Sequence, residues 1–141
     1  MPDTYQSIVI DAPIDAVWAR VSDFHDMSWA SNTITHLEKV GPLAGNQVGA
    51  GRILNGTFYE TLMEHAPQSH LLRYSIDDGP SPVSKTDVSN YVGSLRLIPV
   101  EGGRTMVDWS SAWKSDSDAA VGFCSTIYTA LLGELKASFE T

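Results

Sequence analysis

The sequence contains few basic residues, a single cysteine and no long hydrophobic run. Its 141 residues include 9 Lys+Arg against 17 Asp+Glu, which gives a formal net charge of −8. Because an acidic chain with scattered basic residues does not match a phosphate backbone, we expect no nucleic-acid binding. The lone Cys124 excludes an internal disulfide, as is typical of a reducing compartment, and we therefore expect a cytoplasmic location.

Membrane-directed segments are also missing from the sequence. The longest stretch without charge, residues 119–133, is too short and too polar to cross a bilayer. The first residues lack the basic start and the apolar core of a secretory signal, so we expect no membrane insertion. With 43% hydrophobic and 18% charged residues, the composition is that of one globular domain over residues 1–141.

The predicted elements are a strand, a short helix, about six further strands and a long terminal helix. Residues 5–10 form a β-branched run, and residues 14–21 carry apolar side chains at helical spacing after Pro13. Asn55-Gly56 is a strong signal for a hairpin turn. A second apolar stripe predicts a helix over residues 116–139. The middle strands are predicted at residues 34–40, 52–54, 57–64, 71–76, 90–98 and 105–113. This order indicates an α+β fold in which one curved antiparallel sheet wraps around the terminal helix.

Charged residues at alternate positions predict which face of each strand points to solvent. In four strands the charges share one parity: Glu60, Glu64, Arg73, Asp77, Arg96, Asp108 and Lys114. The opposite parity predicts these inward side chains: Tyr59, Thr61, Met63, Leu72, Tyr74, Ile76, Tyr91, Gly93, Leu95, Leu97, Val107, Trp109, Ser111 and Trp113. The predicted interior therefore holds hydroxyls and indole N–H groups but no carboxylate and no histidine.

This inward set is more polar than an ordinary core. Buried Tyr and Trp side chains need hydrogen-bond partners, and a mixture of aromatic rings and hydroxyls is typical of a ligand cavity. The alternative is a wet core in which these polar groups satisfy one another. We favour the cavity.

Several blocks of the sequence, in this order and spacing, resemble a known superfamily. They are Ile10-Asp11-Ala12-Pro13, Val17-Trp18, Val21-Ser22-Asp23-Phe24, Trp29, residues 48–52, residues 72–76, residues 90–97, Gly103-Arg104-Thr105 and Val107-Asp108-Trp109-Ser110. The chain resembles the START-like (SRPBCC) superfamily and its polyketide cyclase/dehydrase-type branch, and is similar to the birch pollen allergen and the plant abscisic-acid receptors. The resemblance implies a helix-grip fold with a deep cavity between sheet and terminal helix, which holds a hydrophobic or amphipathic small molecule. We expect no cofactor.

The hormone receptors of this superfamily use an inward Lys and Glu to help bind a ligand carboxylate. By approximate register, Met63 stands here at the position of that Glu, and Trp109 replaces another inward Glu. Tyr91 matches an inward receptor Tyr. The resemblance therefore implies a pocket but not an acid-binding one.

Other chemical motifs are weak. His65 and His70 flank a turn around Pro67 without a third ligand, so we expect no metal site. His25 and Asp26 lie near Trp29 at the predicted pocket mouth, where either an acid/base role or a solvated loop would explain them. Cys124, on the apolar stripe of the terminal helix, is interpreted as a core residue.

The leading hypothesis is that the chain binds a small hydrophobic or amphipathic molecule, aromatic, polycyclic or lipid-like, in an internal cavity. The alternative is a polyketide cyclase/dehydratase that acts on a poly-β-ketone in the same cavity, which would need a titratable residue inside it. A protein-interaction module would need an exposed apolar patch, which the sequence does not identify. The sequence leaves open whether the chain forms a homodimer. The predicted ligand-binding residues are Trp29, Tyr59, Met63, Tyr74, Tyr91, Trp109, Trp113, Phe123 and Ile127.

Overall fold

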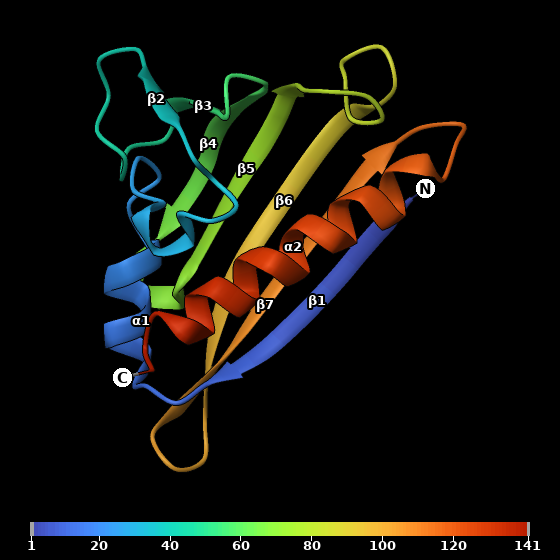
Figure 1. Ribbon diagram of the computed structural model, residues 1–141. Helices are drawn as coiled ribbons and strands as arrows, with labels where there is room; N and C mark the ends of the chain where they lie inside the picture. Colours follow the sequence, from blue (N-terminus) through green and yellow to red (C-terminus); the bar gives the residue numbers. More distant parts are fainter. Residues whose placement is uncertain (1, 141) are drawn as a thin grey trace.

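Seven antiparallel strands make one sheet that curves around a long helix in the computed structural model, which describes residues 2–140 (Figure 1). The strands are β1 (Asp3–Ile10), β2 (Leu37–Val40), β3 (Gly51–Leu54), β4 (Phe58–Ala66), β5 (Leu71–Asp78), β6 (Ser89–Val100) and β7 (Arg104–Lys114). The helices are α1 (Ile14–Val21), the 3-10 turns η1 (Ser28–Ala30) and η2 (Pro67–Ser69), and α2 (Ala119–Ala137). This architecture confirms the predicted helix-grip fold.

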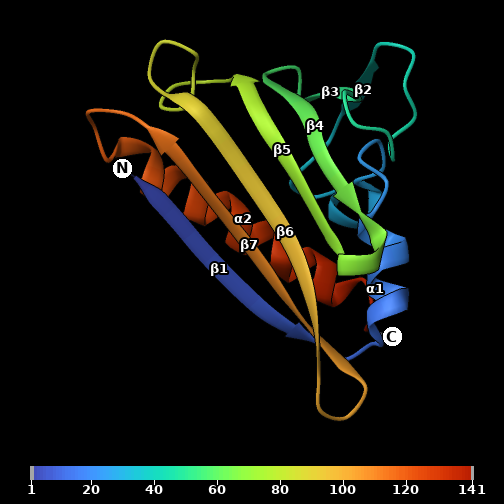
Figure 2. The ribbon, with the colours of Figure 1, turned by 180° about the vertical axis from the view of Figure 1, so that it is seen from behind.

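The strand order is β1-β7-β6-β5-β4-β3-β2, so each strand from β2 to β7 pairs with its neighbour in sequence. β1 adds to the free edge of β7, where Gln6 lies opposite Trp109. Helix α2 covers the concave face, whereas the view from behind shows the strands in front of it (Figure 2). The space between this face and α2 is therefore where internal side chains must pack.

Helix α2 presents its apolar stripe to the sheet. Its buried residues are Ala120, Cys124, Tyr128, Leu131, Leu132 and Leu135. The helix begins at Ala119 rather than at residue 116, because Ser115 and Ser117 accept hydrogen bonds from the backbone N–H groups two residues later and hold a turn there. No helix among residues 2–140 is long and apolar enough to cross a membrane.

The C-terminal end of α2 is fixed to α1. The Arg20 guanidinium donates to the Ser138 carbonyl oxygen over 2.6 Å and lies 3.8 Å from the centre of the Phe139 ring. These contacts anchor α1 and α2 to each other at one end of the concave face.

The β3–β4 hairpin confirms the predicted turn at Asn55-Gly56. Both residues have positive φ, 54° and 69°. The pairing of Leu54 with Phe58 leaves Thr57 as a third loop residue, so the register differs by one residue from a two-residue hairpin.

We expect Gly56→Val to lower the free energy of unfolding by about 1–3 kcal/mol through backbone strain. A side chain at Gly56 would meet no atom within 4 Å, so steric contact does not contribute. Urea denaturation measures the effect. Gly56→Asn is the matched control and should lower the free energy of unfolding much less than Gly56→Val, because Asn tolerates positive φ. Equal stability of the Val and Asn variants would contradict this account of the turn.

Candidate functional site

A small apolar cavity lies between the concave face and α2. The volume open to the centre of a water molecule is about 40 Å³, which is room for a few waters. Its walls are Met27, Ile34, Arg52, Leu54, Phe58, Glu60, Tyr74, Ile76, Tyr91, Trp109, Phe123, Cys124, Ile127, Tyr128 and Leu131. The sheet and α2 both contribute to these walls, so the cavity exists only when α2 is packed against the sheet.

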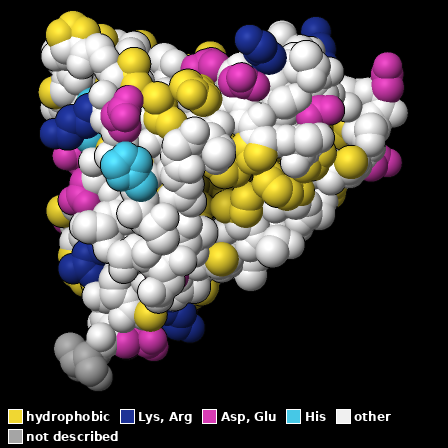
Figure 3. All heavy atoms as spheres, turned by 45° about the horizontal axis from the view of Figure 1, so that its top comes forward, with side chains coloured by type: hydrophobic (Ala, Val, Ile, Leu, Met, Phe, Trp, Pro, Cys, Tyr) yellow, Lys and Arg dark blue, Asp and Glu magenta, His cyan; other side chains and the backbone are white. Residues whose placement is uncertain are grey.

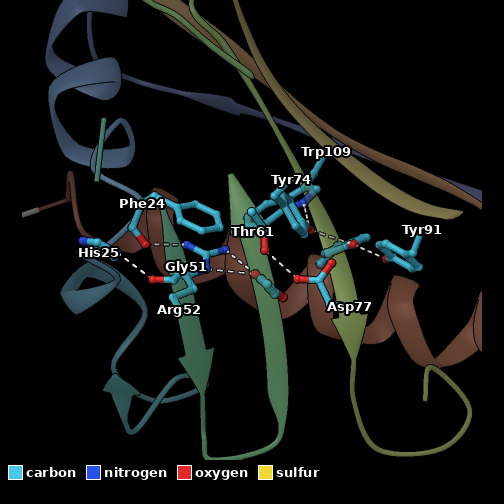
Figure 4. Close-up of polar contacts among 11 residues, drawn as sticks. Phe24, His25, Gly51, Arg52, Thr61, Tyr74, Asp77, Tyr91 and Trp109 are labelled. Atoms are coloured by element: carbon cyan, nitrogen blue, oxygen red, sulfur yellow. Dashed lines mark hydrogen bonds and ion pairs between the residues drawn. The ribbon is translucent and has the colours of Figure 1, made fainter. Parts of the chain in front are cut away.

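A chain of hydrogen bonds between aromatic side chains forms the inner wall. The Trp109 indole N–H donates to the Tyr74 hydroxyl over 3.0 Å, and the hydroxyls of Tyr74 and Tyr128 lie 2.8 Å apart. Tyr128 is bonded in turn to Tyr91, whose hydroxyl donates to Ser111 Oγ over 3.0 Å. Figure 4 shows Trp109, Tyr74 and Tyr91 pointing toward one another along this chain. The indole N–H of Trp109 can only donate, so the hydrogen bonds run in one direction, from Trp109 through Tyr74, Tyr128 and Tyr91 to Ser111. In this order every phenolic hydrogen has an acceptor.

These hydroxyls are also kept protonated by their surroundings. Burial raises the pKa of Tyr74, Tyr91 and Tyr128 well above the usual value for a phenol. Burial likewise raises the pKa of the Cys124 thiol, which argues against a reactive thiolate.

An ion pair is buried beside this chain of hydroxyls, with the Arg52 guanidinium carbon 5.6 Å from the centre of the Tyr74 ring. Arg52 Nε and Nη2 donate to the same oxygen of Glu60, Oε1, over 2.9 and 2.7 Å. Arg52 Nη1 donates to the Phe24 carbonyl oxygen over 2.9 Å, and the guanidinium carbon lies 3.7 Å from the centre of the Phe24 ring (Figure 4). Arg52 is therefore fixed on several sides, and the Glu60 carboxylate lines the cavity.

The environment of Glu60 changes its acidity. Burial raises the pKa of the Glu60 carboxyl, and the Arg52 guanidinium offsets only part of that rise. Glu60 is only 6% exposed. A carboxyl with a raised pKa inside a cavity is suited to accept or release a proton.

The predicted orientation of β4 was wrong because Glu60 does not mark the solvent face. Tyr59 and Met63 are 45% and 48% exposed, whereas Glu60 and Leu62 are buried. The register shifts between Leu62 and Glu64, so Glu60 faces in and Glu64 faces out. The interior therefore contains a carboxylate, contrary to the prediction. Tyr59 and Met63 lie outside the cavity, and Thr61 bonds to Asp77 on the outer face.

The predicted orientations of β5, β6 and β7 are confirmed, and they place Tyr74, Tyr91 and Trp109 in the cavity wall. Phe123 and Ile127 of α2 line it as well. The other two predicted residues lie next to it. Trp29 packs on Trp109 with ring centres 6.4 Å apart, and Trp113 stacks on Tyr91 at 5.3 Å. The Trp113 Nε1 is buried without a hydrogen-bond partner among the described residues.

The histidines lie outside the cavity wall. His25 Nε2 donates to the Gly51 carbonyl oxygen over 2.8 Å, and two hydrogen bonds from Ser28 lower the pKa of Asp26. His65 and His70 pack on the Trp18 ring at 5.5 and 5.8 Å. Within residues 2–140, no three His, Cys, Asp or Glu side chains are arranged to hold a metal ion.

Comparison with known proteins agrees with this geometry. The profile of the polyketide cyclase / dehydrase and lipid transport family matches residues 1–140. The chain belongs to this family. It is a member of the START-like superfamily, as the sequence resemblance indicated. No curated protein matches the chain.

Solved structures share the fold of this family member. A protein from Nitrosospira multiformis is 46% identical, with a TM-score of 0.96 over 99% of this chain and 97% of that one. XoxI from Bacillus cereus is 22% identical, with a TM-score of 0.80 over 99% and 96%. Norcoclaurine synthase from Thalictrum flavum, solved with dopamine and hydroxybenzaldehyde, is 14% identical, with a TM-score of 0.74 over 96% and 84%.

We expect Gly93→Ala to lower the free energy of unfolding by about 1–3 kcal/mol. Gly93 lies opposite Tyr74 in the sheet, and a Cβ there would come within 2.6 Å of the Tyr74 hydroxyl oxygen. The ring would have to move and would disturb the chain of hydroxyls. Thermal denaturation with near-UV circular dichroism measures both effects.

Gly122→Ala on α2 is the control for this change. A Cβ at Gly122 meets nothing within 4 Å, so the helix should gain up to about 1 kcal/mol. If Gly93→Ala were as stable as wild type, the close packing of Tyr74 on this strand would be refuted.

Proposed function

We propose that the protein binds a small hydrophobic or amphipathic molecule in the cavity between the sheet and α2. The observation that carries the proposal is an apolar cavity whose wall holds both a buried carboxylate and a chain of hydroxyls. Membership of the polyketide cyclase / dehydrase and lipid transport family supports it. Norcoclaurine synthase, which shares the fold, was solved with two small aromatic molecules, and this too supports an aromatic ligand.

A ligand must enlarge the cavity before it can enter, because the present volume holds only a few waters. Half-buried hydrophobic side chains form the part of the wall that can give way. Phe58 and Phe123 stack with ring centres 6.3 Å apart, and Ile127 lies one turn further along α2. Figure 3 shows hydrophobic side chains gathered in a patch on one face of the molecule. We propose that rotation of the Phe58, Phe123 and Ile127 side chains admits a single aromatic ring first.

An enzymatic role is the second candidate, and Glu60 is the observation that favours it. A cyclase or dehydratase must move protons, and Glu60 supplies a titratable carboxyl inside the cavity. Apolar walls would fold the substrate and exclude water. The protonated tyrosines could donate a hydrogen bond to a developing enolate only by breaking their own chain, so Glu60 is the residue that we assign to proton transfer.

We expect Ile127→Ala to increase the affinity for ethylbenzene on the order of tenfold. The side chain lines the cavity, and its removal relieves the crowding of a bound ring, which costs roughly 1–3 kcal/mol. Titration followed by the indole N–H signal of Trp109 in NMR spectra measures the affinity. The matched control is Thr129→Ala, an exposed position on the same helix, which should bind like wild type. An affinity of Ile127→Ala equal to that of the wild type would contradict the assignment of Ile127 to the wall of the ligand site.

We expect the protein to accelerate the ring opening of 5-nitrobenzisoxazole, a reaction that needs only a base to remove one proton. The rate should rise with pH as Glu60 ionises, with a midpoint above the usual Glu value of about 4.3, because burial raises this pKa. Spectrophotometry of the phenolate product gives the rate. Glu60→Gln should abolish the pH-dependent part.

The control for this assay replaces both members of the ion pair, as Arg52→Met with Glu60→Leu. An apolar pair of similar size keeps the fold without leaving Arg52 unpaired, so it should also lose the rate. A wild-type rate in a folded double variant would remove Glu60 from proton transfer.

A further inference from the structure

The Arg52–Glu60 pair is asymmetric, and both residues line the cavity. Both bonds from Arg52 end on Oε1 of Glu60, while Oε2 accepts no hydrogen bond from any described residue. The side chain is more than nine-tenths buried, and it lines the cavity. A carboxylate oxygen without a partner in an apolar site is costly, because a charged acceptor gains more than a neutral one from a hydrogen bond.

The neighbouring polar groups do not supply that missing bond in the structure. The chain from Trp109 through Tyr74, Tyr128 and Tyr91 already gives each phenolic hydrogen an acceptor. The Nε, Nη1 and Nη2 atoms of Arg52 each donate one hydrogen bond to a protein oxygen, and both bonds to Glu60 end on Oε1. The cavity wall therefore holds one carboxylate oxygen without a hydrogen bond, while the phenolic donors beside it are already engaged.

From this geometry we infer that the ligand carries a neutral hydrogen-bond donor, a hydroxyl or an N–H group, which it places on Glu60 Oε2. This inference rests on the proposed binding function and adds the chemical class of the ligand. It selects phenols, alcohols and neutral amines or amides with an apolar body.

Charge balance disfavours the two other classes of amphipathic ligand. Arg52 and Glu60 neutralise each other, so a cationic ligand would bring an uncompensated charge into an apolar cavity. An anionic ligand would place its carboxylate against that of Glu60, and like charges at close range are repulsive. A neutral donor meets neither penalty.

The test compares three ligands that share one ring: 4-ethylphenol, its methyl ether 4-ethylanisole, and 4-ethylbenzoate. Binding to the intact protein is measured by NMR titration at neutral pH. We expect 4-ethylphenol to bind about tenfold or more tightly than the methyl ether, since only the phenol can donate to a charged acceptor. The benzoate should bind more weakly than both.

The double variant Arg52→Met with Glu60→Leu tests the assignment to Glu60. It removes both charges together and so avoids an unpaired buried ion. It should bind the methyl ether at least as well as wild type, and its preference for the phenol should fall to about twofold or less. Thr61→Val is the matched control: it lies on the same strand, with its hydroxyl bonded to Asp77 on the outer face, and should keep the full preference.

Each result decides a different point. Equal binding of phenol and methyl ether by wild type, or binding of the benzoate as tight as that of the phenol, would overturn the inference and leave the proposed function standing. A phenol preference that survives in the double variant would overturn the role of Glu60. Absence of binding by all three ligands would overturn the proposed function, and the inference with it.

Discussion

The buried pair of Arg52 and Glu60 is the constraint on which the site depends. The β3–β4 register places the two residues opposite each other, and Arg52 also holds the loop after α1 through the carbonyl oxygen and ring of Phe24. Removing one partner of such a pair typically costs about 3–5 kcal/mol, because the remaining charge stays buried. The same contacts that make the pair tolerable leave one carboxylate oxygen of this cavity-lining residue without a hydrogen bond. The stability of the β3–β4 hairpin and the polarity of the cavity therefore both depend on this ion pair.

The polar interior also explains how the sheet holds its helix. Tyr128 of α2 is bonded to Tyr74 and Tyr91 of two strands, so the helix is fixed by hydrogen bonds in addition to apolar contacts. The sequence left two alternatives for these aromatic residues, a ligand cavity or a wet core. Both descriptions apply in part: the hydroxyls satisfy one another, and a small cavity lies beside them.

The sequence was sufficient to predict the fold and the orientation of three strands that line the site, β5, β6 and β7. Arg73, Arg96 and Asp108 lie on the outer face, so parity placed Tyr74, Tyr91 and Trp109 in the interior correctly. Parity failed in β4 because it treats every charge as solvated and every strand as regular. A bulge separates the two glutamates, and an arginine on the neighbouring strand makes one of them tolerable inside. The hairpin itself carried a usable signal, since Arg52 and Glu60 stand at equal distances from its three-residue loop.

A crystal structure of the protein soaked with 4-ethylphenol would test the central claim most directly. We expect the ring to lie between Phe58, Phe123 and Ile127, and the phenol oxygen about 2.5–3.0 Å from Glu60 Oε2, with the Arg52 contacts unchanged. A ligand that binds on the outer surface, or one that turns its hydroxyl away from Glu60 toward the tyrosines, would contradict it.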